Sequence, residues 1–194
     1  MNETSKSHDL RIQKDHYNKY LFGEGIDIGA GSDPLKIING SVLPYDVQSG
    51  DANLLSNIND DMFDFVYASH CLEHMKNIRT ALFNWCRVLK SGGYLYITVP
   101  DFALYEKYIW PSRFNPDHKF NFSLDISRNE YDRSNFYNIY DDLSPILLKN
   151  NVEIIETDLQ TNNYNDTLGD DVDQTLQNAL IQINIIGKKN GTNS

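Results

Sequence analysis

The sequence has few cysteines and no long apolar run. Only Cys71 and Cys86 occur among 194 residues, and no CxxC or CxxH spacing is present. A structural zinc site of the finger type therefore has no support, and both thiols are expected to be free and buried. No run of 18 apolar residues occurs, and the first residues form no apolar leader. We expect no membrane span, no secretory signal and a cytoplasmic location.

Basic residues are also scarce. Lys and Arg number 17 against 27 Asp and Glu, which gives a net charge of −10, and the longest basic cluster is Lys188-Lys189. Proteins that bind nucleic acids or anionic membranes draw much of their affinity from basic side chains. The composition therefore argues against both classes of partner.

The length predicts one domain over residues 1–194, with residues 1–8 and 188–194 flexible. Apolar periodicity and glycine or proline punctuation predict helices and strands in alternation. Such alternation indicates an α/β fold with a mostly parallel sheet, which binds ligands at the carboxyl ends of its strands. The expected helices are 9–22, 77–89 and 133–150, and the strands are 26–28, 42–47, 63–67, 94–99, 152–157 and 179–187, with an aromatic-rich insertion at 100–131.

The segment Gly25 to Pro34 contains the first strand and the glycine turn Gly29-Ala30-Gly31 that follows it. Such a turn lets the backbone approach a ligand where a Cβ would collide. A dinucleotide site requires glycine at the sixth position counted from Gly29, and Pro34 stands there, which argues against a nucleotide-binding oxidoreductase. Asp27 suits a ligand with an ammonium group. Asp46, at the end of the second strand, is either an acceptor for two ribose hydroxyls or an exposed loop acid.

Two longer segments, Phe63 to His74 and Trp85 to Asp101, resemble the class I S-adenosylmethionine-dependent methyltransferases, most closely the type 11 group. With GIDIGAG and Gly50-Asp51-Ala52, the resemblance covers residues 25 to 101. It implies a Rossmann-like three-layer sandwich of about six or seven strands, antiparallel at the last strand. It also implies S-adenosylmethionine as cofactor.

The resemblance further implies a role for each matching residue. Asp27 and Gly29 would face the amino-acid end of the cofactor, with room made by Ala30 and Gly31. The other implied contacts are Asp46 with the ribose, Val47 with the adenine face, Asp51 and Ala52 with the adenine edge, and Ser69 and His70 with the methionine part. The third family glycine is replaced by Asp33, and the short interval from Asp46 to Phe63 implies a reduced edge strand.

The acceptor side is expected in the insertion, where His118 is the candidate general base, oriented by Asp117 or Asp101. A histidine near neutral pKa suits proton removal from a hydroxyl. The competing interpretation makes His118 a loop residue that holds the insertion together, and His74 is expected to be structural. The aromatic residues that offer an apolar wall are Tyr105, Tyr108, Trp110 and Phe114.

We therefore expect methyl transfer, by in-line displacement, to an oxygen of a small-molecule or saccharide acceptor. Some similar short type 11 proteins are linked to surface-polysaccharide assembly. The open alternative is a non-catalytic S-adenosylmethionine-binding domain. Nothing in the sequence predicts an oligomeric state.

Overall fold

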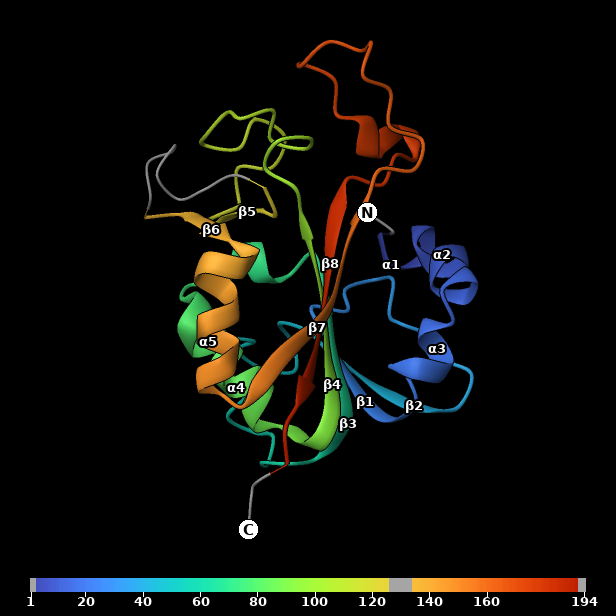
Figure 1. Cartoon of the computed structure of the whole chain (residues 1–194), viewed down its shortest axis with the longest axis vertical. Coiled ribbons are helices and arrows are strands. Elements are labelled where there is room, and N and C mark those ends of the chain that lie inside the picture. Colours follow the sequence, from blue (N-terminus) through green and yellow to red (C-terminus); the bar gives the residue numbers. More distant parts are fainter. Residues whose placement is uncertain (1–2, 126–133, 192–194) are drawn as a thin grey trace.

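The computed structural model describes residues 3–125 and 134–191 and has a six-stranded sheet at its centre (Figure 1). The strand order is β2-β1-β3-β4-β8-β7. Strands β1 to β4 are parallel, and β8 runs antiparallel to both β4 and β7. The predicted α/β class and mostly parallel Rossmann-like sheet are confirmed. The strands are β1 Gly23–Ile28, β2 Gly40–Tyr45, β3 Phe63–Ser69, β4 Leu89–Pro100, β7 Val152–Gln160 and β8 Gln182–Lys189.

The strand order reverses at β1, because β2 lies on one side of β1 and β3 on the other. This is the position at which open α/β sheets bind ligands, outside the carboxyl ends of the strands. Residues 46 to 62, between β2 and β3, contain no strand. In the short interval between Asp46 and Phe63, turns therefore take the place of the reduced edge strand that the resemblance implied.

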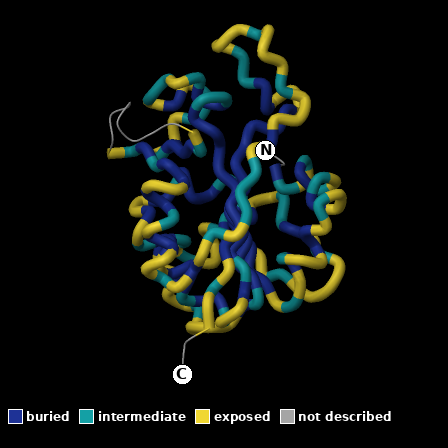
Figure 2. Tube along the Cα trace, viewed as in Figure 1, coloured by how far each residue is buried: buried dark blue, intermediate teal, exposed yellow. Residues whose placement is uncertain are grey.

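Helices cover the two faces of the sheet (Figure 1). α4 (Ile78–Arg87) and α5 (Ser144–Lys149) lie on one face, and the short α1 (Glu3–Lys6), α2 (His8–Gln13) and α3 (His16–Lys19) lie on the other. Alternate residues of β3 point to opposite faces, so Val66 joins the larger core and Phe65 the smaller one. The buried strands run through the middle of the molecule, between partly exposed helices (Figure 2).

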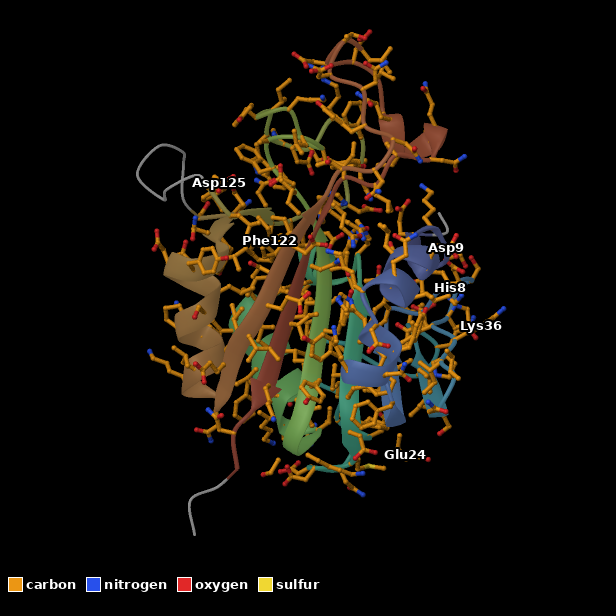
Figure 3. The ribbon with its side chains drawn as sticks, turned by 45° about the vertical axis from the view of Figure 1, so that its right-hand side comes forward. His8, Asp9, Glu24, Lys36, Phe122 and Asp125 are labelled. Atoms are coloured by element: carbon orange, nitrogen blue, oxygen red, sulfur yellow. The ribbon has the colours of Figure 1, made fainter. Side chains whose placement is uncertain are left out.

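Two segments project beyond the carboxyl ends of the parallel strands (Figure 1). The first follows β4 and contains β5 (Asn121–Ser123), which pairs with β6 (Phe136–Asn138). The second joins β7 to β8 and contains η3 (Gln174–Gln177). Figure 3 shows Phe122 and Asp125 in the first segment, at the opposite end of the sheet from Glu24 near the start of β1.

The helices differ most from the sequence prediction. The expected helix 9–22 is two helices separated by Asp15, which has a left-handed φ of 60°. The expected helix 133–150 is wrong over its first half: β6 and the π-helix η2 (Ile139–Leu143) precede α5. The Asn138 side chain accepts from the backbone of Tyr140 and Asp141 and so starts the helical segment there.

The two chain ends contain secondary structure. Residues 3–8 are mostly helical, and Lys188 and Lys189 belong to β8. Residues 1–2 and 192–194 of the expected flexible ends, and 126–133, lie outside the described residues. Within the described part, no helix has the length and apolar character needed to cross a bilayer.

Candidate cofactor and acceptor site

The loop that follows β1 is held close to the neighbouring strand. The backbone amides of Gly29 and Ala30 donate to the carbonyl oxygen of Tyr45, at 2.8 and 3.3 Å. Gly29 has a φ of +79°, and a Cβ there would lie 2.7 Å from the sulfur of Cys71. Only glycine fits this conformation and this packing together, which explains the residue at the turn.

Asp27 lies beneath this loop rather than on the surface of a cavity. Its side chain is buried, and its Oδ2 accepts from the backbone amide of Leu35 at 2.7 Å. Burial raises the pKa of Asp27 to about 6. The structure thus gives Asp27 a role in shaping the loop, and it does not place Asp27 among the residues that line either cavity described below.

Asp33 stands where the family has its third glycine, and it anchors the amino-terminal segment. Its carboxylate accepts from the Ser5 backbone amide at 2.8 Å and from the Ser5 hydroxyl. Glu3 and Thr4 consequently line the same cavity as the glycine loop. The sequence analysis missed this contribution, because no local pattern in residues 1–8 indicates a partner far along the chain.

An open cleft of about 650 Å³ lies beyond the carboxyl ends of β1 and β2. The Val47 side chain is 85% exposed in it. Asp51 accepts from the backbone and side-chain amides of Asn53, at 2.8 and 2.9 Å, and these bonds lower the pKa of Asp51. The cleft brings together six of the predicted cofactor residues, namely Gly29, Asp46, Val47, Asp51, Ala52 and His70.

Trp85 holds in place the part of the cleft wall that contains Ala52. Its side chain is fully buried, and its Nε1 donates to the carbonyl oxygen of Ala52 at 2.8 Å. The backbone of the Asp51-Ala52 pair is therefore held against α4. This leaves the Asp51 side chain exposed at the cleft, as a group that reads an adenine edge requires.

A smaller cavity of about 200 Å³ adjoins the cleft, and Gly29, His70 and His74 line both. It contains further predicted cofactor residues together with the predicted base. The predicted residues that line it are Gly29, Ala30, Gly31, Ser69, His70 and His118. The two neighbouring cavities together are the candidate site for a nucleoside, its amino-acid part and an acceptor.

His70 is held between two oxygen-bearing side chains in this site. It has a positive φ of 51°, its Nε2 lies 2.9 Å from Gln182 Oε1, and its Nδ1 lies 3.4 Å from Glu73 Oε1. Both ring nitrogens thus face side-chain oxygens. Burial alone would lower the pKa of His70, but the adjacent Glu73 carboxylate raises it above the ordinary value.

His118 is buried and paired with Glu106. Its Nδ1 lies 2.7 Å from Glu106 Oε1, and both side chains are almost fully enclosed. The predicted orienting groups, Asp117 and Asp101, are therefore wrong. Asp101 Oδ1 accepts from the backbone of Leu104. Asp117 contributes its backbone oxygen, which accepts from His74 Nδ1 at 3.2 Å.

Most of the residues predicted to form an aromatic wall do not line the smaller cavity. Tyr105 is buried, lines the smaller cavity and lies with its ring centroid 5.6 Å from that of His118. Phe114 packs behind Tyr105 at 5.7 Å, and Tyr108 is 53% exposed. Of the four aromatic residues, Tyr105 alone lines this cavity.

Glu73, His74 and Glu106 are site residues that the sequence analysis did not assign to the site. Glu73 and His74 end the family-like segment Phe63 to His74, in which the sequence predicts only a structural role for His74 and none for Glu73. Glu106 carries no signal, since its partner His118 is brought to it by the fold of the insertion. Glu73, His74 and His118 offer potential metal ligands within 4.8 Å of one another.

The comparisons with known proteins agree with this geometry. Residues 25–97 match the model of a methyltransferase domain. This segment is a methyltransferase type 11 domain. That family implies S-adenosylmethionine as the methyl donor. None of the curated proteins that were compared matches the sequence.

Solved structures similar to this methyltransferase support the fold. An S-adenosylmethionine-dependent methyltransferase from Methanosarcina mazei is 17% identical with a TM-score of 0.55, over 89% of this chain and 96% of that one. A putative methyltransferase in complex with the Haloferax volcanii Trm112 activator is 13% identical with a TM-score of 0.59, over 98% and 94%. A possible histamine N-methyltransferase from Thermotoga maritima is 18% identical with a TM-score of 0.52, over 97% and 100%.

Proposed function

We propose that this methyltransferase acts on a hydroxyl oxygen of a small-molecule or saccharide acceptor, with His118 as general base. The observation that carries the proposal is the buried His118–Glu106 pair on the wall of the cavity that the cofactor loop also lines. A base there would face an acceptor that enters the cavity beside the cofactor loop.

The hydrogen bonds of His118 suit this role. Glu106 accepts from Nδ1, so the lone pair of the neutral imidazole is on Nε2. The cofactor supplies an electrophilic methyl group. With the cofactor bound, Nε2 would take the proton of the acceptor hydroxyl as its oxygen bonds to the methyl carbon and the carbon–sulfur bond breaks. The Glu106 carboxylate then stabilises the imidazolium that forms, as an acid behind a catalytic histidine does.

The lining of the smaller cavity favours a polar acceptor. Thr4, Asn115 and Thr175 contribute hydrogen-bonding side chains next to His74 and His118. Its volume of about 200 Å³ is below the range of roughly 300–1,000 Å³ usual for drug-sized ligands. A single sugar ring or the end of a larger molecule suits this volume.

The test compares three variants for turnover and for cofactor affinity. His118→Gln and Glu106→Gln should lower kcat, the former by about 10²–10⁴-fold, and leave the cofactor Kd unchanged. Asp46→Ala should do the opposite and raise the cofactor Kd about 10- to 100-fold, because it removes charged acceptors for the ribose. Calorimetry with S-adenosylmethionine and a panel of sugars and metabolites with labelled cofactor provide the two measurements.

Near-normal turnover in His118→Gln would remove the base from the proposal. Tight cofactor binding with no transfer to any acceptor of the panel would favour the alternative, a non-catalytic S-adenosylmethionine-binding domain. Methylation of an amine rather than a hydroxyl would contradict the proposed acceptor class.

A further inference from the structure

Three potential metal ligands from two parts of the chain meet beside the smaller cavity. Glu73 and His74 belong to η1 (Leu72–His74), which follows β3, and His118 comes from the insertion after β4. One ligand atom from each lies within 4.8 Å of the other two, and all three residues line the cavity. Among the described residues, no other group of three such side chains is found.

The Glu73 carboxylate is the first reason to consider a cation. The side chain has no exposed surface, and neither oxygen has a hydrogen-bond partner within the described chain. Its Oε1 lies at an ion-pair distance of 3.4 Å from His70 Nδ1. A buried carboxylate that lacks hydrogen bonds is costly, and a coordinated cation would occupy the free oxygen.

The two histidines are already in the tautomer that a metal ligand needs. His118 Nδ1 donates to Glu106, and His74 Nδ1 donates to the backbone oxygen of Asp117. Both Nε2 atoms therefore carry lone pairs. Histidine ligands of metals typically donate the other ring N–H to a carboxylate or a backbone carbonyl, and this site contains one example of each.

The surrounding charges allow a divalent ion. His70 and Lys119 are the neighbouring cations, and Lys119 Nζ donates to the His74 carbonyl at 2.6 Å. Against them stand the carboxylates of Glu73 and Glu106, and those of Glu3 and Asp33 in the same cavity. Acids thus outnumber bases around the three ligands.

We propose that Glu73, His74 and His118 bind a divalent transition-metal ion of the zinc class, with its remaining coordination position open to the cavity. Two imidazole nitrogens and one carboxylate oxygen form a known ligand set for zinc sites that keep an open position. Tetrahedral bonds of about 2.0–2.1 Å would place the ligand atoms roughly 3.4 Å apart, so each needs to move by about 1 Å. Mg²⁺ and Ca²⁺ prefer oxygen ligands and should bind poorly.

This site goes beyond the proposed function and affects it in one respect. The ion and the proposed base use the same lone pair on His118 Nε2. The metal-loaded protein should therefore lose most of its turnover, and a chelator should restore it.

The test measures metal binding directly, on chelator-treated full-length protein. Calorimetry with Zn²⁺ and the visible spectrum with Co²⁺ should show one site per chain. Glu73→Gln, His74→Gln and His118→Gln should each weaken binding by more than about 100-fold, and Glu106→Gln by about 10–100-fold. His8→Gln is the matched control, because His8 lies on α2 and bonds Tyr17, away from this cavity; it should bind like the parent.

Each variant must retain S-adenosylmethionine binding, which shows that it is folded. The proposal is overturned if neither ion binds, or if binding survives both Glu73→Gln and His74→Gln. Neither of these results affects the proposed methyl transfer. If turnover instead requires the metal, the metal site stands and the base role of His118 is wrong.

Discussion

At the scale of single residues, two glycines of one loop make different demands on the backbone. Gly29 has a φ of +79°, and a Cβ there would meet the Cys71 sulfur at 2.7 Å. Gly31 has a φ of +52°, within the left-handed region that other residues visit, and the nearest atom to an added Cβ is 3.9 Å away. Glycine is therefore favoured by both backbone conformation and packing at position 29, and by backbone conformation alone at position 31.

Gly29→Ala should destabilise the protein and weaken cofactor binding, whereas Gly31→Ala should cost less. The strained φ alone costs of order 1–3 kcal/mol, and the contact with Cys71 adds to it. Thermal unfolding and cofactor titration of both variants measure the difference. Equal losses in the two would contradict the role assigned to the contact with Cys71.

The residue scale also shows which motif residues the fold brings together. Asp46, Val47, Asp51 and Ala52 were assigned from a pattern of adjacent residues, and they line one cleft. Asp27 was assigned in the same way but faces the underside of its loop. A pattern fixes which residues follow a strand, but the direction of a side chain within the strand depends on what covers that face.

At the scale of elements, the amino-terminal segment forms part of the wall of the smaller cavity. Ser5 bonds Asp33, Lys6 Nζ donates to the Thr175 carbonyl at 2.6 Å, and the Ser7 hydroxyl accepts from Gln182 at 2.9 Å. These bonds join three parts of the chain that are distant in sequence. They place α1 beside the segment that connects β7 to β8.

Asp33→Ala should release this segment without unfolding the sheet. Hydrogen exchange over residues 3–13 should become faster, and bound S-adenosylmethionine should dissociate faster, because part of its cavity wall is lost. Asp9→Ala is the matched control, since Asp9 is an exposed acid on α2 (Figure 3). Unchanged exchange in Asp33→Ala would show that the Ser5 bonds do not hold the segment.

Elements with local signals were predicted well. Asn77 accepts from the Thr80 amide and starts α4, whose apolar face was readable from its spacing. The helix expected from residue 133 failed because β6 pairs with β5, a partner in another part of the chain. No periodicity within residues 134–138 indicates that pairing.

At the scale of the whole molecule, two buried acids shape the dependence of stability on pH. Burial raises the pKa values of Asp27 and Asp101 to about 6. In the unfolded chain these groups ionise near their ordinary value of about 3.9. Between these values the folded state binds more protons, so both acids reduce stability as the pH rises from about 4 to 6.

Asp27→Asn should remove one of these contributions. Relative to the parent, its free energy of unfolding should rise from pH 4 to 6 and stay level above, by an amount on the order of 2–3 kcal/mol. Urea unfolding of the cofactor-free protein between pH 4 and 8 measures this difference, with Asp9→Asn as the exposed control. A difference that does not vary with pH would contradict a raised pKa at Asp27.

The sequence alone determined the alternation of elements, the glycine loop and the motif residues of the cofactor cleft, because each depends on residues close together in the chain. The tertiary structure decided the partners of the ionisable side chains: Glu106 for His118, His70 for Glu73 and Ser5 for Asp33. These pairs join loops whose relative position is set by the sheet they extend from. Local propensity carries no information about that position, so these pairings became visible only in the folded chain.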